Sequence, residues 1–593
     1  MRRLGLAALV LTPALLAVPA AALFRAEPKP AAAPARKVGD FRLPDTAGKV
    51  WSLKDLKDRK AVVVVFLGTE CPVNNAYAPR LAELHKELAP KGVAFLAINA
   101  NCQDTAARIA AHARRFALPF PVLKDTANVV ADRFGARRTP EAFVLSPDGT
   151  VLYQGRIDDQ FGVGFNRKAP TRRDLAAAVE EVLAGKPVSV PATDAAGCLI
   201  ARAVKPKEGG AVTYSKQVSR IFQARCQECH RPGQIGPMPL LTYEDGLAWS
   251  GMIQEVVSEG RMPPWHADPR HGSFSNDRRL SKQERADLLA WIEGGCPKGD
   301  VSELPPPRTF AEGWRIGKPD LVVDMGETFT VPAEAEGGLK YQYFTVPTRF
   351  REDRWVQAAE AKPANRAVVH HIIVYVVAPG QGRGRGRGQR GPDGIGEGLL
   401  VAHAPGDLPA VLPAGTAKRI PKGSLLIFQM HYTPNGREQD DRSSLGLIFA
   451  KGPPQFEAKS RSIAQRRLDI PPRAANHEVR SAGTIERDVE LISLMPHMHL
   501  RGKDFTYRVV FPDGKADTLL AVPHYDFGWQ SNYRLAKPLQ LPKGTRIECT
   551  AHFDNSADNP NNPDPNKLVR WGDQTWEEMM IGFVDYRLPV EKR

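Results

Sequence analysis

Hydrophobic residues follow three successive patterns along the chain. Between residues 61 and 185, short apolar runs such as AVVVVFLG (from Ala61) and VAFLAINAN (from Val93) alternate with stretches of helical periodicity. EAFVLSPDGTVLYQG predicts a hairpin that turns at Asp148-Gly149. Strands and helices in alternation, followed by a hairpin and a last helix, predict an α/β sheet with helices on its faces.

The pattern becomes helical from about 211 to 300. YSKQVSRIFQARC and LSKQERADLLAWIEGG each predict a helix, and Ser281 and Glu284 of the second stand at the spacing of a capping box. After residue 316, short alternating strands separated by Pro, Gly, Asn and Asp continue to the end. That pattern is typical of β-sandwiches, and the stretch is long enough for two.

Pro-, Ala- and Gly-rich stretches at 27–40, 186–210 and 303–313 indicate where the chain divides. A length of 593 residues also favours several domains. We therefore expect a signal peptide, an α/β domain, a helical domain and two β-sandwiches, at residues 1–22, 37–190, 209–302, 316–455 and 456–593.

The first residues predict export. Arg2 and Arg3 precede an uncharged run from Leu4 to Phe24 that ends in small residues, which is the pattern of a secretory signal. We expect a periplasmic or otherwise extracytoplasmic protein. The run is also long enough that, uncleaved, it would tether the protein to the membrane.

Composition excludes some classes of protein. Hydrophobic residues make up 42% and charged residues 25%, as in soluble globular proteins. The net charge of +15 is spread along the chain without a basic stripe interleaved with aromatics, and the dense patch at Arg383 to Arg390 is predicted to be a loop. No nucleic-acid partner is expected. Seven cysteines are too few for a disulfide framework, which suggests individual roles.

Cys226, Cys229 and His230 form the Cys-x-x-Cys-His arrangement of a covalently attached c-type haem. The thiols would add to the haem vinyl groups and His230 would be the proximal ligand. A Met thioether as sixth ligand raises the potential. Met262 is favoured over Met238, which follows the motif too closely and is expected to line the pocket. The stretch resembles small cytochrome c domains.

The β-rich half carries histidines in groups that suit a metal. Side chains two apart in a strand share a face, so His497 and His499 can converge on one ion. Adjacent His370 and His371 would diverge unless a bulge re-aims one of them. Neutral imidazoles suit copper and a thioether favours the cuprous state, although three histidines would also suit zinc.

In sequence order these motifs resemble the copper type II ascorbate-dependent monooxygenases over residues 319–593. The resemblance implies two copper ions, one for electron storage and one that activates O₂. The first would be held by His370, His371 and His431, and the second by His497, His499 and Met579. It also implies catalytic roles for the second set, a small-molecule substrate, O₂, and ascorbate or a redox protein as reductant.

The chain departs from that family at two places. The Cys that follows the family's Met ligand is here Met580, so Cys549 has lost its expected disulfide partner. The residues that hold a peptide carboxylate in the amidating members correspond here to Met495, Ile581 and Phe583. A neutral or apolar, non-peptide substrate is therefore expected, because a buried carboxylate needs a cationic partner.

Cys71, in FLGTECPVNNAYAPRL, begins a helix after a buried strand, where the helix N-terminus lowers a thiol pKa. Pro140 follows Thr139 where thioredoxin folds keep a cis-proline facing the active Cys. Residues 37–185 resemble a redoxin of the thioredoxin and alkyl hydroperoxide reductase/thiol-specific antioxidant superfamily.

This redoxin lacks the usual second thiol, because Asn74 stands where a Cys-x-x-Cys motif has its second Cys. Thr69 also breaks the peroxidatic spacing. Cys71 is therefore expected to act catalytically alone or with Cys102; the alternative is a scaffold domain with a residual thiol.

Together these patterns predict a multidomain fold: an α/β thioredoxin-like domain, an all-α cytochrome c-like domain and two all-β, jelly-roll-like copper sandwiches. The expected function is hydroxylation of a C–H bond with O₂, with electrons from the haem, ascorbate or both. One alternative is a haem and thiol electron-transfer protein with a non-catalytic copper-binding region; another is a copper-storage module.

Overall fold

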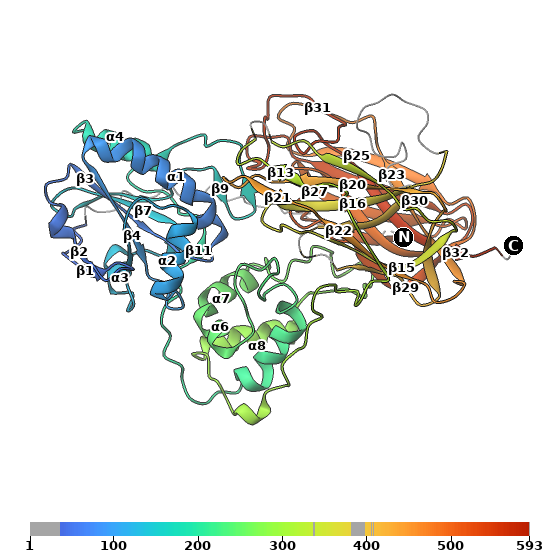
Figure 1. The fold of residues 1–593 in the computed structure, drawn as a ribbon, viewed down its shortest axis with the longest axis horizontal. Helices are drawn as coiled ribbons and strands as arrows, with labels where there is room; N and C mark the ends of the chain where they lie inside the picture. Colours follow the sequence, from blue (N-terminus) through green and yellow to red (C-terminus); the bar gives the residue numbers. More distant parts are fainter. Residues whose placement is uncertain (1–35, 336–337, 381–397, 405, 407, 592–593) are drawn as a thin grey trace, which may run out of the picture.

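The computed structural model describes residues 36–335, 338–380, 398–404, 406 and 408–591. The expected signal peptide and the arginine-rich patch at 383–390 lie outside the described residues. Figure 1 shows an α/β domain in blue, a helical region in green and a β-rich region in yellow to red. No helix among the described residues is long and apolar enough to cross a membrane.

The α/β domain is built on a five-stranded sheet of order β5-β4-β3-β7-β8. β3 pairs in parallel with β4 and antiparallel with β7. The strands are β3 (Ala61–Phe66), β4 (Val93–Asn99), β5 (Val122–Lys124), β7 (Glu141–Leu145) and β8 (Val151–Gly155). The helices are α1 (Pro72–Leu88), α2 (Ala106–Arg115), α3 (Val129–Phe134) and α4 (Asp174–Leu183). The expected alternation and the hairpin at Asp148-Gly149 are confirmed.

β3 is buried on both faces because helices cover the sheet on either side. Its odd-numbered residues, among them Val63, pack in one core with α1 and α4, and its even-numbered residues, among them Val64, pack in the other with α3. The Thr139-Pro140 peptide bond is cis, as the thioredoxin resemblance implies.

The chain remains on this domain beyond residue 190. β11 (Cys198–Leu199) pairs antiparallel with β6 (Arg138–Thr139), next to the cis-proline. Ile200 is buried in the core beside α3. The stretch that looks like a linker in sequence therefore completes the α/β domain.

The helical region begins with a continuous helical stretch from Tyr214 to Cys226, formed by η3 (Tyr214–Val218), α5 (Ser219–Ile221) and η4 (Phe222–Cys226). It continues with α6 (Tyr243–Ala248), α7 (Ser250–Ser258) and α8 (Lys282–Glu293). The capping box of Ser281 and Glu284 at the start of α8 is confirmed. Phe222 and Trp291 form the centre of its core.

The β-rich region has one long sheet covered by two smaller ones. Among the described residues the long sheet runs β12-β22-β15-β19-β23-β32-β26-β29, with β18 on β15. Its strands are β12 (Leu321–Asp324), β15 (Arg354–Lys362), β18 (Ala410–Val411), β19 (Thr416–Ile420), β22 (Ser444–Phe449), β23 (Phe456–Ala464), β26 (Val489–His497), β29 (Tyr533–Leu541) and β32 (Ile581–Pro589).

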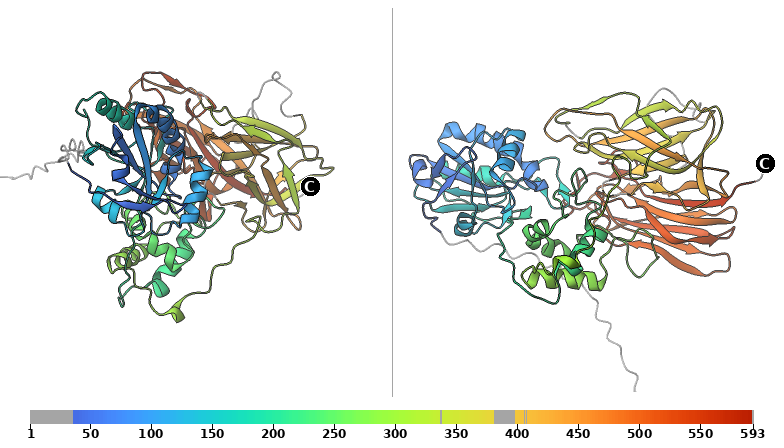
Figure 2. Two further views of the ribbon diagram at one scale, coloured as in Figure 1. Left: turned by 60° about the vertical axis from the view of Figure 1, so that its left-hand side comes forward. Right: turned by 60° about the horizontal axis from the view of Figure 1, so that its bottom comes forward.

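One four-stranded sheet belongs to each half of this region, and Figure 2 (right) shows the two halves side by side. The first has the order β14-β20-β16-β17, with β14 (Gln342–Pro347), β16 (Val369–Val377), β17 (Leu399–His403) and β20 (Leu425–Tyr432). The second has the order β25-β30-β27-β28, with β25 (His477–Thr484), β27 (Gly502–Val510), β28 (Ala516–Val522) and β30 (Arg546–Phe553).

The two halves share backbone hydrogen bonds, which separate sandwiches would not. Thr416 and Ala417 of β19 pair in parallel with Phe456 and Glu457 of β23, so the long sheet is continuous at the expected boundary between residues 455 and 456. This pairing fixes the relative position of the histidines in the two halves.

Candidate metal centres and thiol pair

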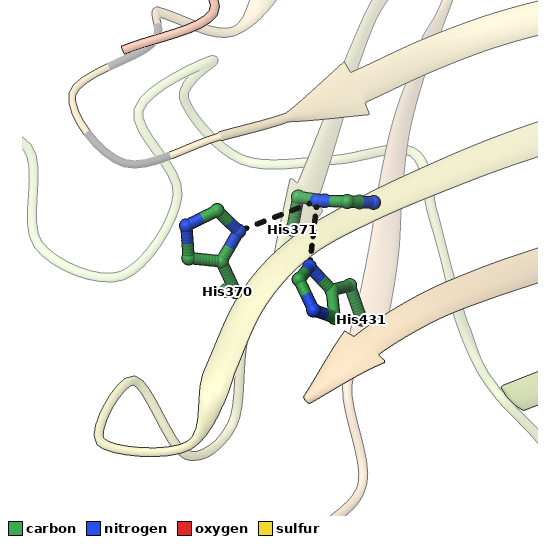
Figure 3. A group of neighbouring side chains, drawn as sticks. All are labelled: His370, His371 and His431. Carbon is green, nitrogen blue, oxygen red and sulfur yellow. Dashed lines mark hydrogen bonds between the residues drawn. The ribbon is translucent and has the colours of Figure 1, made fainter. Parts of the chain in front are cut away.

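His370, His371 and His431 converge at the end of the β16–β20 pair, as Figure 3 shows. His371 is opposite His431, and the register shifts between Val369 and His371. One potential ligand atom from each ring lies within 4.8 Å of the others. The shift is the irregularity that the adjacent histidines were expected to need.

Nδ1 atoms face the centre of this cluster. His371 Nδ1 lies 3.4 Å from His370 Nδ1 and 3.3 Å from His431 Nδ1. Burial lowers the pKa of His370 to about 4, and burial followed by the neighbouring imidazoles takes the pKa of His371 and His431 well below the usual value. The rings are therefore neutral at pH 7 and can offer lone pairs to a metal.

His497 and His499, at and just after the end of β26, form a second pair with ring centroids 5.2 Å apart. His497 Nδ1 donates to Gln530 Oε1 at 2.6 Å, and His499 Nδ1 donates to the Glu577 carbonyl at 3.1 Å. Both Nε2 atoms then carry the lone pair, and His499 Nε2 is buried without a hydrogen-bond partner. Burial lowers the pKa of His497, and lowers that of His499 to about 3.

The Glu578 carboxylate connects Met579 to this histidine pair through hydrogen bonds to the backbone. It is fully buried and accepts backbone N–H groups from His499, Arg501 and Met579 at 2.8, 2.7 and 3.2 Å. Burial raises its pKa to about 7 in spite of these donors. Sequence reasoning missed this structural role of Glu578, although an acidic residue directly before the apolar run MMIGFV was a signal.

Met579 and Met580 enter different environments. Met579 packs with Ile581 and Phe583 in a small apolar cluster, and the Phe583 ring lies 6.2 Å from the His497 ring. Met580 is fully buried in the main core of the C-terminal half.

Phe527 connects the two histidine groups. Its ring stacks on His370 at 5.6 Å and 13°, and lies 6.4 Å from the His431 ring and 6.0 Å from the His499 ring. It belongs to the loop between β28 and β29 that also supplies Gln530. Sequence reasoning missed this loop, because an isolated Phe in a turn carries no metal-ligand signal.

Met495 and Phe583 line a cavity of about 40 Å³ between the two halves. Lys418, Arg534 and Asp585 line it as well, so this cavity has charged groups beside the apolar side chains of Met495 and Phe583. Ile581 lies outside that lining. Lys418 Nζ donates to the carbonyls of Leu399 and Leu400 at 2.7 and 3.3 Å and to Ser460 Oγ at 3.1 Å, which uses all three of its donors.

The Cys-x-x-Cys-His motif closes the first helical stretch. The N–H groups of Cys229 and His230 donate to the Cys226 carbonyl at 3.1 and 2.9 Å, so all three residues lie in one turn. His230 is buried and its Nδ1 donates to the Met238 carbonyl at 3.1 Å, which leaves Nε2 with a lone pair. Burial lowers the pKa of His230 and raises that of Cys226 to about 12.

Met262 follows α7, where its N–H donates to the Val256 carbonyl at 3.2 Å. The chain then leaves the helical core: Trp265 and Phe274 are buried in the core of the C-terminal half. The Trp265 ring lies 4.8 Å from that of Tyr533. The Met262 segment is therefore attached to the β-rich region.

Cys71 is the N-cap of α1 and is almost completely buried. Its thiol donates to the Thr139 carbonyl at 2.9 Å and accepts the Cys198 N–H at 3.3 Å. Burial alone would raise its pKa. Hydrogen bonds from the Cys198 thiol and the Asn74 and Cys198 backbones outweigh burial and lower the pKa of Cys71 to about 7. The thiol of Cys102, which was one of the two options for Cys71, lies 3.8 Å from Gln103 Oε1.

Comparison with known protein families gives a match to the N-terminal domain. A model of the AhpC/TSA family matches residues 34–154. The thiol-disulfide oxidoreductase ResA of Bacillus thuringiensis (strain Al Hakam) is 31% identical over 119 residues, which are 20% of this chain and 67% of ResA. ResA of Bacillus subtilis (strain 168) is 33% identical over 115 residues, 19% of this chain and 62% of its own length.

Solved structures are also similar to part of this chain. A hypothetical protein from Sinorhizobium meliloti 1021 is 33% identical, covers 29% of this chain and 95% of its own, and has a TM-score of 0.27. The family match, the sheet order and the cis-proline confirm the redoxin resemblance of the N-terminal domain. Through residues 34–154 the chain belongs to the AhpC/TSA family, and a large β-rich region follows at its C-terminal end.

Proposed function

We propose that this protein is an exported oxidoreductase whose β-rich region binds two copper ions and hydroxylates a C–H bond of a small molecule with O₂. The observation that carries the proposal is the convergence of His370, His371 and His431, brought together by the bulge in β16. Nothing in the periodicity of a strand requires that convergence.

The residues present fit copper in both places. The first cluster offers three neutral imidazoles whose Nδ1 atoms already lie within 3.4 Å of a neighbour. The second offers the buried, unpartnered His499 Nε2, together with His497 and the thioether of Met579. A thioether is a soft ligand and favours cuprous copper over zinc. Bound copper would supply one-electron redox steps and O₂ activation, which side chains alone do not provide.

Residues around the ligands would orient them and exclude water. Gln530 and the Glu577 carbonyl hold the rings of His497 and His499 in the tautomer that directs Nε2 away from the hydrogen bond. Glu578 fixes the backbone of His499 and Met579 together. The mixed lining of the cavity at Met495 and Phe583 supports a small, neutral, non-peptide substrate, because its two cations, Lys418 and Arg534, are already bound to carbonyl groups.

The helical region is proposed to hold the covalent haem, with His230 as proximal ligand. Arg231 and Arg278 support this, because both influence the pKa of Cys229 and each has a buried Nε without a hydrogen-bond partner. Such donors suit carboxylates like the haem propionates. The Met238 carbonyl accepts the hydrogen bond that orients His230, and the thioether of Met262 would be the second iron ligand.

Electron supply within the chain is supported by how the Met262 segment is anchored. Asp268 N–H donates to the Ala521 carbonyl at 2.8 Å, and Phe274 bridges to Leu535. These contacts flank the loop that carries Phe527 and Gln530. Ascorbate or a redox protein remains an alternative or additional reductant, and the redoxin domain is proposed to carry out thiol–disulfide chemistry at Cys71, as the name of its ResA relatives suggests.

The test is metal analysis, an absorption spectrum and O₂ uptake, all on the full chain purified from an exporting host. We expect two copper ions and one haem per chain, and O₂ consumption that depends on an organic substrate. Copper and haem without substrate-dependent O₂ uptake would favour the alternative, an electron-transfer protein with a non-catalytic copper region. Copper that does not change oxidation state with the haem would instead indicate storage.

A further inference from the structure

A second thiol reaches Cys71 from a distant part of the sequence. Cys198 of β11 is the register partner of Thr139, the residue before the cis-proline. The Thr139 carbonyl is 2.9 Å from Cys71 Sγ, and the Cys198 N–H donates to the same sulfur at 3.3 Å. Asn74, at the usual position of the second Cys, is instead buried and bonded to the Gly68 carbonyl at 2.7 Å.

The two thiols differ in pKa because their environments differ. The pKa of Cys71 is lowered to about 7, while the hydrogen bond to Cys71 and then burial raise the pKa of Cys198. Cys71 therefore holds the negative charge of the pair, and it is the better leaving group from any disulfide between them.

We propose that Cys71 and Cys198 form a reversible disulfide that exchanges with small thiols through Cys198. Cys198 is partly exposed whereas Cys71 is buried, so Cys198 is the more accessible of the two to an external thiolate. The proposed disulfide rests on the thiol–disulfide role proposed for Cys71, and it depends on neither copper nor haem.

Two successive thiol–disulfide exchanges reduce the pair. A small thiolate RS⁻ attacks Cys198 Sγ, the Cys71–Cys198 bond breaks, and Cys71 leaves as a thiolate. A second RSH, after losing its proton, attacks the R sulfur of the RS–S–Cys198 bond, and the Cys198 thiolate takes up a proton. One RS⁻ and one RSH become RSSR, and the protein disulfide becomes the Cys71 thiolate and the Cys198 thiol. Oxidation by a small disulfide is the reverse sequence.

The segment around Cys198 also contacts the helical region. Leu199 N–H lies 3.4 Å from Met252 Sδ, and Arg138 of β6 pairs with Glu255 of α7 at 2.9 Å. Breaking or forming the disulfide therefore alters Cys198, which lies next to the contact between the redoxin domain and α7.

The test uses oxidised and reduced glutathione on the full chain, followed by acid quench, alkylation of free thiols and peptide mass spectrometry. Trypsin separates Cys71, Cys102 and Cys198 into the peptides 61–80, 92–108 and 174–202. We expect a 61–80/174–202 cross-link that forms and disappears with the glutathione ratio. In Cys71→Ser, glutathione should remain on Cys198, at least about tenfold more than in wild type, because no neighbouring thiolate displaces it.

Cys102→Ser is the matched control and should leave the cross-link unchanged. A Cys71–Cys102 cross-link, glutathione on Cys71 rather than Cys198, or a Cys71–Cys198 bond that reduces only on unfolding would each overturn the pair as proposed. Absence of any exchange at all three cysteines would overturn the thiol role of the domain itself.

Discussion

His371 of β16 lies opposite His431 of β20, and their Nδ1 atoms are 3.3 Å apart. The register shift next to His371 brings the ring of His370 to the same centre, at 3.4 Å from His371 Nδ1. In a regular strand the two adjacent side chains would point to opposite faces. The first metal centre thus depends on a local irregularity of the backbone.

His431→Ala should remove copper from this first centre, because two imidazoles bind far more weakly than three. We expect the copper content of the full chain to fall from two ions to one, with slow turnover and an unchanged haem spectrum. Metal analysis after dialysis is the measurement. His552→Ala, outside both groups, is the control and should retain both ions; equal loss in the two variants would contradict the assignment.

Met579→Leu and Met580→Leu form a matched pair at adjacent residues. Either change conserves volume and should cost less than about 1.5 kcal/mol of stability. Only Met579 lies in the cluster beside the His497 ring, so Met579→Leu should abolish substrate-dependent O₂ uptake while Met580→Leu retains it. The opposite result would move the ligand role to Met580.

Cys226→Ala should weaken the covalent attachment of the haem, measured by extraction into acid acetone. Met262→Ala should lower the haem potential and make the iron high-spin, because a thioether ligand raises the potential. Met238→Ala should do neither, since Met238 uses its backbone carbonyl to hold His230. A spin change in Met238→Ala but not in Met262→Ala would reverse the two roles.

Alkylation of Cys71 should rise with pH around a midpoint near 7. The folded pKa is lowered to about 7, so the reactive thiolate is lost only as the pH falls through that value. Cys198→Ala removes a hydrogen bond to Cys71 and should shift the midpoint upwards, whereas Cys198→Ser keeps a donor and should shift it less. Site-resolved peptide mass spectrometry gives the rates. A wild-type midpoint near the ordinary thiol value of about 8.5 would favour the scaffold interpretation.

Local patterns in the sequence specify the type of most helices and strands. The buried run of β3, the hairpin at Asp148-Gly149 and the capping box of Ser281 are local features, set by periodicity and by side chains within a few residues. The Cys-x-x-Cys-His spacing is local in the same way, because one helical turn carries all three residues.

Contacts between residues far apart in the sequence depend instead on how the strands pair in the folded protein. Cys198 lies in a stretch that resembles a linker, and it becomes the neighbour of Cys71 through two residues of pairing with β6. Phe527 contacts His370 and His499 because β19 and β23 join the two halves in one sheet. Pairing between strands far apart in sequence, and the bulge that turns His370, arise from long-range packing that a hydrophobic pattern does not encode.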